Sequence, residues 1–184
     1  MTKQLCEQTR ITNWLVVLVF LTFVQGLASA AESGDRDGRV LPSFNAPEGC
    51  VVEKVAGQPL INYPLFACFD DEGRLYVAEG TGLNVPGTEL VKKKLGRITR
   101  LEDIDGDGRF DKSTLFADEL VFPQGVLWYD GAVYTASHPN IWKLEDSDGD
   151  GRADRREVVV GQFGFNGNGC DIHGPFLGPD GYLY

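Results

Sequence analysis

The sequence RLEDIDGDGR at residues 100–109 decides the fold class, because it returns as KLEDSDGDGR at residues 143–152. The two copies begin 43 residues apart. The blades of β-propellers, each a four-stranded sheet, repeat roughly every 40–50 residues. The spacing therefore predicts that the chain contains successive copies of one such sheet.

A second short pattern, a glycine followed by a tyrosine-bearing strand, occurs three times. Its copies are GRLYV at 73–77, GAVYT at 131–135 and GYLY at 181–184. Asp and Gly residues precede the tyrosine strands, as they do in the turns of β-hairpins. The copies lie 58 and 50 residues apart, so we expect the blades to differ in length through insertions in their loops.

Most of the chain consists of short runs rich in Val, Ile, Leu, Tyr and Phe, separated by Gly, Pro, Asp and Asn. No stretch after Ala30 keeps a period of 3.6, so long helices are not expected. We therefore predict an all-β fold over residues 44–184, a β-propeller of four-stranded antiparallel blades. Propellers close with about 4–8 blades. This length provides about three, so we expect an incomplete fragment, the N-terminal part of a longer protein.

Residues 1–30 have the three parts of a secretory signal peptide. Lys3 and Arg10 form a basic start, an apolar run follows at 14–24, and small residues stand at 28–30. The apolar run is shorter than the roughly 20 residues of a membrane span, and an uncleaved anchor is the alternative. We predict an exported protein, periplasmic or extracellular. Membrane association would come through an uncleaved signal or through regions beyond this sequence.

Composition and cysteine content limit the partners of the exported chain. A net charge of −10 argues against binding nucleic acid, which is itself an anion. Residues 31–43 are polar and aperiodic, and we predict a disordered leader there. Export permits disulfides, but Cys50, Cys68 and Cys170 allow at most one internal bridge. A bridge between Cys50 and Cys68 and a set of buried thiols are equally compatible with the sequence.

Both copies of the Asp-Gly pattern place acidic residues where a calcium loop needs them. Positions 1, 3, 5 and 9 are Asp103, Asp105, Asp107 and Asp111 in the first loop and Asp146, Asp148, Asp150 and Asp154 in the second. A glycine at position 6 permits a sharp turn. Glu157 supplies an acid at position 12, where the first loop has Thr114. Ca²⁺ binds 6–8 oxygens, and this spacing wraps carboxylates around one such ion.

The residues that flank these loops are typical of strands, so the loops are not helix-flanked EF-hands. Clustered aspartates repel one another unless a cation neutralises them. Magnesium is disfavoured because it keeps its water ligands. The alternative is a solvated Asp-Gly turn without a metal. We expect calcium to order two long hairpin loops.

The Gly-rich polar segment at 166–176 is the candidate catalytic loop, because such loops cross propeller faces where ligands bind. Within it, His173 lies two residues from Asp171. A histidine oriented by a carboxylate is the usual general base for a hydroxyl proton. The alternative is a histidine bonded within its own loop. We interpret His138 as a turn residue, and Lys92–Lys94 as a solvated loop or a contact for an anionic cofactor.

The sequence resembles a known family in several stretches. They are FNAPEG at 44–49, FDDEGRLYVAE at 69–79, GRI at 96–98 leading into the first Asp loop, and HGPFLGPDG at 173–181. These are similar to the N-terminal β-propeller of the membrane-bound dehydrogenases of planctomycetes and related bacteria. The similarity covers residues 44–184. Longer members of that family carry helical repeats and a c-type cytochrome domain.

That family is distantly similar to the soluble quinoprotein sugar dehydrogenases, six-bladed propellers that use pyrroloquinoline quinone (PQQ). In those enzymes a histidine ahead of a Gly-Pro-Asp-Gly strand removes a proton while the quinone accepts hydride. The resemblance implies this role for His173, which stands closer to its Gly178 strand than in the sugar enzymes. It implies an exported quinoprotein-type dehydrogenase that oxidises a sugar or alcohol, with a cytochrome c domain as partner and a fragment that is inactive alone. The other hypothesis is a non-catalytic, calcium-stabilised propeller that binds a glycan or a protein.

Overall fold

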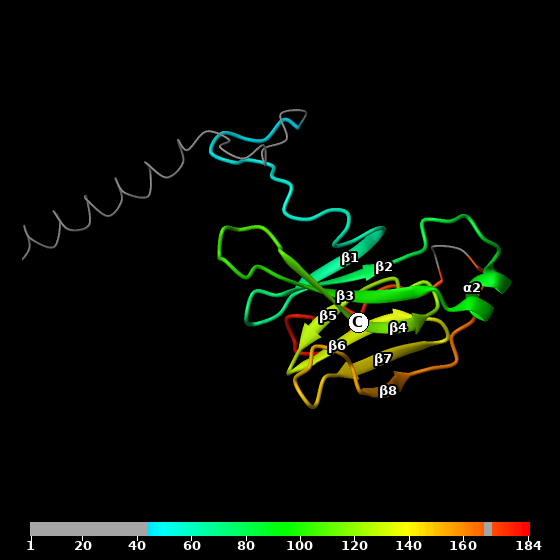
Figure 1. Ribbon diagram of the computed structural model, residues 1–184. Coiled ribbons are helices and arrows are strands. Elements are labelled where there is room, and N and C mark those ends of the chain that lie inside the picture. Colours follow the sequence, from blue (N-terminus) through cyan, green and yellow to red (C-terminus); the bar gives the residue numbers. More distant parts are fainter. Residues whose placement is uncertain (1–43, 168–170) are drawn as a thin grey trace, which may run out of the picture. The chain divides into compact units, whose positions relative to one another are not determined.

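The structure is a computed structural model that describes residues 44–167 and 171–184 (Figure 1). The chain divides into two units, residues 1–54 and 55–184, and the strands described below all belong to the second. The predicted signal peptide, the predicted leader and Cys170 lie outside the described residues. Those predictions therefore stay predictions.

The second unit begins with a four-stranded antiparallel sheet in which consecutive strands are neighbours. Its strands are β1 (Pro64–Phe69), β2 (Leu75–Glu79), β3 (Gly96–Glu102) and β4 (Lys112–Leu120). A short helix, α2 (Gly87–Lys93), lies in the connection from β2 to β3. Lys92 and Lys93, which we interpreted as loop residues, form the last turn of this helix. The first Asp loop joins β3 to β4, at the opposite end of the sheet from α2 (Figure 1).

A second sheet repeats this arrangement. Its strands pair antiparallel in chain order, β5 (Leu127–Tyr129), β6 (Ala132–Ser137), β7 (Asn140–Glu145) and β8 (Arg155–Val160). The second Asp loop joins β7 to β8, so the two copies of the repeated sequence occupy the same place in the two sheets. The prediction of an all-β fold built from four-stranded antiparallel sheets is confirmed.

The third repeat is smaller than the sequence predicts. The spacing predicts about three blades, whereas the described residues form two complete sheets, which do not close into a ring. Beyond them, Leu177 and Leu183 form a single antiparallel bridge. Phe176 and Tyr184 exchange backbone hydrogen bonds of 2.9 Å in both directions. The third tyrosine pattern lies in this hairpin, as the first two lie in β2 and β6.

Asp-Gly turns form the hairpins that open both sheets. In the first sheet, the carboxylate of Asp70 accepts hydrogen bonds of 2.9 Å from the backbone N–H groups of Glu72 and Arg74. Gly73 has a φ of 80°, a left-handed conformation that a glycine adopts without a Cβ clash. Gly131, with a φ of 77°, has the same role between β5 and β6. Local sequence is therefore sufficient to define both turns.

Aromatic side chains join the two sheets into one core. Tyr76 of β2 stacks on Trp128 of β5 with ring centroids 5.5 Å apart, and it meets Phe116 of β4 edge-on at 4.9 Å. Burying each such ring contributes about 2 kcal/mol to the free energy of folding. A backbone hydrogen bond of 2.7 Å from Ala153 to Phe116 ties the second Asp loop to β4. Of the strands from different sheets, β1 and β5 approach each other most closely.

A close backbone approach holds the segment after β8 against the second sheet. Gly125, just before β5, lies so near Gly174 that an added Cβ would overlap the Gly174 carbonyl oxygen. The same carbonyl accepts a hydrogen bond of 3.2 Å from Ala136 N, and Gly174 N donates one of 3.2 Å to Gln124 O. The segment that carries His173 is therefore fixed to β6 by its own backbone.

The outer strand β8 leaves apolar side chains in solvent. Val158, Val159 and Val160 are 45%, 43% and 51% exposed. Within the described sheets, β8 pairs with β7 on one side only. One edge of the second sheet therefore combines unpaired backbone groups with three β-branched apolar side chains.

Candidate functional site

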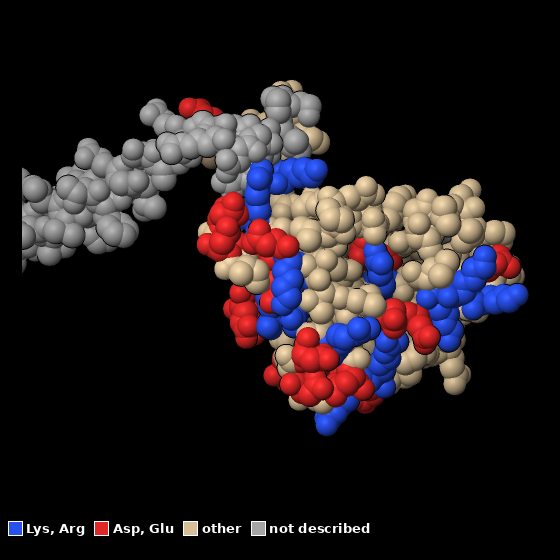
Figure 2. All heavy atoms as spheres, in the orientation of Figure 1, with Lys and Arg blue, Asp and Glu red and all other residues tan. Residues whose placement is uncertain are grey.

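The two Asp loops have the same internal hydrogen bonds, and acidic side chains gather at the end of the sheets where they lie (Figure 2). In each loop the carboxylate at position 1 accepts the backbone N–H groups of positions 4 and 6. These bonds run from Gly106 and Gly108 to Asp103 (2.8 and 2.9 Å) and from Gly149 and Gly151 to Asp146 (both 2.8 Å). The loop backbone thus wraps around its first aspartate in both sheets.

The remaining hydrogen bonds of the two loops also match. In both loops the carboxylate at position 3 accepts the N–H of position 5 at 3.2 Å, and the carboxylate at position 5 accepts the N–H of position 7 at 2.8 Å. The carboxylate at position 9 accepts the N–H of position 2 at 3.0 Å in the first loop and 2.9 Å in the second. The repeated sequence therefore has one conformation.

Three carboxylates in each loop lie close enough together to share one cation. They are Asp103, Asp105 and Asp111 in the first loop and Asp146, Asp148 and Asp150 in the second. Within each group the ligand oxygens lie within 4.8 Å of one another. Oxygens bound to one Ca²⁺ at roughly 2.3–2.6 Å stand at most about 5 Å apart. Each group therefore has the dimensions of a calcium coordination shell.

Two predicted ligands of the second loop have further contacts. The carboxylate of Asp154 accepts hydrogen bonds from the hydroxyl (2.5 Å) and the backbone N–H (2.9 Å) of Ser147. These bonds, the hydroxyl first, lower the pKa of Asp154. Glu157, the predicted ligand at position 12, lies on β8 directly across from Lys143 on β7. The ammonium of Lys143 is 2.9 Å from the carboxylate of Glu145.

The second loop also lies beside a buried cation of the first sheet. The side chain of Arg100 on β3 is 8% exposed, and it is 3.0 Å from the carboxylate of Glu102 and 3.8 Å from that of Asp146. A Cβ added to Gly151 would lie 2.5 Å from Nη2 of Arg100. The Nε atom of Arg100 is buried and has no hydrogen-bond partner among the described residues. Any cation bound by Asp146 would therefore have this guanidinium as a neighbour.

The predicted catalytic residues lie in the segment that follows β8. His173 is exposed, and its ring meets Phe66 of β1 edge-on with centroids 6.2 Å apart. The carboxylate of Asp171 accepts backbone hydrogen bonds from Asn166 (2.9 Å) and Gly167 (3.1 Å). Asp171 thus anchors the loop that precedes it, and His173 lies against the first sheet.

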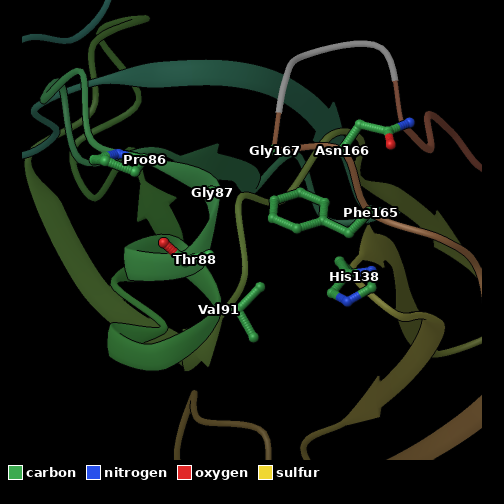
Figure 3. A pocket seen from close by; sticks show the side chains of 8 residues that line it. All are labelled: Pro86, Gly87, Thr88, Val91, His138, Phe165, Asn166 and Gly167. Atoms are coloured by element: carbon green, nitrogen blue, oxygen red, sulfur yellow. The ribbon is translucent and has the colours of Figure 1, made fainter.

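His138, which we interpreted as a turn residue, also lines a cavity of about 540 Å³ (Figure 3). It does lie in the turn between β6 and β7. Its ring stacks on that of Phe165, with centroids 4.6 Å apart and an interplanar angle of 24°. Its Nδ1 atom is buried and has no hydrogen-bond partner within the described chain. The sequence carries no local signal for this contact, because it joins residues from opposite sides of a hairpin and a strand.

Two described cavities do not fit a tricarboxylate such as PQQ. No lysine or arginine lines the cavity beside His138. A cavity of about 460 Å³ between the sheets is lined by Arg74, Arg100 and Lys112. Each of these cations is already within 3.0 Å of a carboxylate, that of Asp70 or of Glu102. Neither cavity therefore offers uncommitted cations for three carboxylates.

The family to which this chain belongs is shown by its sequence profile. The profile described as a domain of unknown function, DUF7133, matches residues 38–184. The chain belongs to the DUF7133 family. No curated protein and no solved structure matches it. The DUF7133 region contains both sheets, both Asp loops and the cavity beside His138.

The cysteines of the DUF7133 region that the structure describes, Cys50 and Cys68, are free thiols. Cys50 is exposed, whereas Cys68 is partly buried, and this burial raises the pKa of Cys68 to about 11. Of the two alternatives, the buried thiol therefore describes Cys68. No helix in the described part of the DUF7133 chain is long and apolar enough to cross a membrane.

Proposed function

We propose that this DUF7133 chain is a calcium-stabilised segment of a β-propeller. Two sheets of the same topology follow one another in sequence, and their first strands, β1 and β5, lie closest. Neighbouring blades around a propeller axis have this arrangement. The bridge between Leu177 and Leu183 repeats the position of the β1–β2 and β5–β6 hairpins and would begin the next blade.

The observation that carries the proposal is the pair of Asp loops with one hydrogen-bond pattern and carboxylates spaced for one ion. Backbone N–H groups already orient these carboxylates, so little reorganisation is needed when a cation enters. The carbonyl oxygens of Arg109 and Arg152, at position 7, would complete the set. An ion that binds only the folded chain at 100 times its Kd stabilises the fold by about 2.7 kcal/mol.

Calcium titration of the chain tests this role. We expect isothermal titration to show two Ca²⁺ sites, and a chelator to lower the Tm. The variant Asp105→Asn should remove the first site and Asp148→Asn the second. Asp130→Asn, in an exposed turn outside both loops, is the matched control and should keep both sites. A Tm that ignores both calcium and chelator would contradict the proposal.

A second candidate concerns the whole protein, an exported quinoprotein-type dehydrogenase that oxidises a sugar or an alcohol. Its support is the resemblance to membrane-bound dehydrogenases, together with the exposed ring of His173, which is accessible to a substrate. His173 would act as the general base for a hydroxyl proton. PQQ would accept the hydride and a cytochrome c domain the electrons. Because two described cavities do not fit PQQ, residues outside the described part would hold the cofactor.

Dye reduction by the full-length protein, supplied with PQQ and calcium, tests this second candidate. We expect turnover with a sugar or an alcohol, and a loss of about 100-fold in kcat for His173→Gln. This chain alone should not turn over. Absence of turnover by the full-length protein would contradict the candidate. The alternative, a non-catalytic propeller that binds a glycan or a protein partner, would then take its place.

A further inference from the structure

Three segments that are distant in sequence form the cavity beside His138. They are helix α2, the turn between β6 and β7, and residues 165–167 after β8 (Figure 3). The cavity lies at the end of the sheets opposite the Asp loops. Its volume of about 540 Å³ falls within the range of roughly 300–1,000 Å³ found for small-molecule sites.

Backbone contacts set the shape of this cavity. A Cβ added to Gly87 at the start of α2 would lie 2.5 Å from the Cα of Gly167, so these two segments touch through their main chains. The carboxylate of Asp171 holds the N–H groups of Asn166 and Gly167 at 2.9 and 3.1 Å. The walls are therefore fixed by the fold itself, and a ligand would enter a space that is already formed.

The side chains that line the cavity are apolar or neutral. Pro86, Val91 and Phe165 provide apolar surface, and Thr88, Asn166 and His138 provide a hydroxyl, an amide and an imidazole. In Figure 3, Val91, Phe165 and His138 lie around one space. No Asp, Glu, Lys or Arg lines it. A charged ligand would lose its hydration here without gaining a counter-charge, which is unfavourable.

The imidazole of His138 is held by stacking, since its buried Nδ1 has no hydrogen-bond partner among the described residues. Most buried polar atoms are hydrogen-bonded. An unpaired one next to a cavity indicates a site whose polar partner comes from outside the described chain. The ring is free of a hydrogen bond at this atom, so it can turn to bond a group placed in the cavity.

We propose that this cavity binds a neutral aromatic ring that carries one or two hydroxyl or carbonyl oxygens, a phenol in its simplest form. The ring packs against Phe165 and Val91, and its oxygen bonds to Thr88, Asn166 or His138. A sugar, with hydroxyls around its whole ring, would leave several of them against apolar walls. This site is separate from the Asp loops, and it rests neither on calcium nor on dehydrogenase activity.

Phenol titrated into the full chain with calcium, followed by saturation-transfer NMR and by the shifts of the His138 ring protons, tests the proposal. Phe165→Ala should weaken binding about tenfold, because the ring loses its stacking partner. Thr88→Val, which keeps the side-chain shape on an exposed helix position, should weaken it several-fold. Phe163→Ala is the matched control, since Phe163 belongs to the same segment, is 36% exposed and does not line the cavity.

Two comparison ligands make the chemical class testable. Benzoate, a charged ring of similar size, and glucose, a neutral sugar, should bind at least tenfold more weakly than phenol. Phenol binding that survives both Phe165→Ala and Thr88→Val, or that Phe163→Ala weakens equally, would overturn the site. Tighter binding of glucose or benzoate would overturn the proposed class of ligand.

Discussion

The two ends of the sheets differ in how they relate to the repeated sequence. At one end, the β3–β4 and β7–β8 loops have the same sequence pattern and the same hydrogen bonds. At the other end, the β2–β3 connection contains helix α2, whereas the β6–β7 connection is the tight turn at His138. The repeat thus provides two equal loops at one end. The cavity forms at the other end, where the repeats diverge.

The largest difference between the ends is expected for glycine substitutions. Gly125→Ala, at the α2 end, places a methyl group onto the backbone of Gly174, which cannot move away. We expect a loss of about 3 kcal/mol in the free energy of unfolding, measured by urea denaturation. Gly131→Ala, at the Asp-loop end, meets nothing within 4 Å and carries only the left-handed backbone penalty of about 1 kcal/mol. Equal losses would show that the close approach is not rigid.

Buried carboxylates give the next difference. The side chain of Glu79 at the α2 end is fully buried and accepts hydrogen bonds from Thr99, from Asn62 N (2.6 Å) and from Arg97 (3.1 Å). We expect Glu79→Gln to lower the free energy of unfolding by about 2 kcal/mol, because Arg97 loses its charged partner. Glu102→Gln, at the Asp-loop end, should have a smaller effect, since the Glu102 side chain is 19% exposed.

The same carboxylate predicts a pH dependence. Burial alone would raise the pKa of Glu79, but the hydrogen bonds from Thr99, Asn62 and Arg97 outweigh it and lower the pKa. Glu79 therefore stabilises the fold above its unfolded-state pKa, and this contribution is lost as the pH falls through the lower folded-state value. Denaturation curves between neutral and acidic pH should show this loss in the parent chain. A Glu79→Gln chain with the same acid sensitivity would contradict it.

Within the Asp-loop end, Arg100 should make the two equal loops unequal. Its guanidinium lies 3.8 Å from Asp146 in the second loop and opposes the charge of a cation there. We expect Arg100→Met to strengthen calcium binding at the second loop about tenfold. Affinity at the first loop, isolated with Asp148→Asn, should not change. Isothermal titration of both double variants separates the two sites, and equal changes at both would count against a direct charge effect.

The smallest expected effect concerns position 12 of the loops. Thr114→Glu gives the first loop the acid that the second has in Glu157, and we expect about a threefold gain in its calcium affinity. Glu157→Thr should lower the affinity of the second loop by a similar factor. Glu157 lies across from Lys143 on the neighbouring strand. If only Thr114→Glu has an effect, Glu157 serves the strand pair and not the ion.

These differences follow what sequence can and cannot predict. The Asp loops and the Asp70–Gly73 turn are predictable because their hydrogen bonds join residues at most seven positions apart. Arg100 beside Asp146, and His138 beside Phe165, depend on how sheets and loops pack, so no local pattern indicates them. Helix α2 is also missing from the sequence prediction, because seven residues are too few for a clear helical period.

The exposed valines of β8 have a consequence for handling this chain in solution. Valine favours extended backbone, and an uncovered sheet edge is a template on which a strand from another molecule can add. The edge at Val158–Val160 has both properties, and the only charges on β8 lie at its start, in Arg155, Arg156 and Glu157. Concentrated preparations of the isolated chain are therefore expected to form ordered aggregates that grow along this edge.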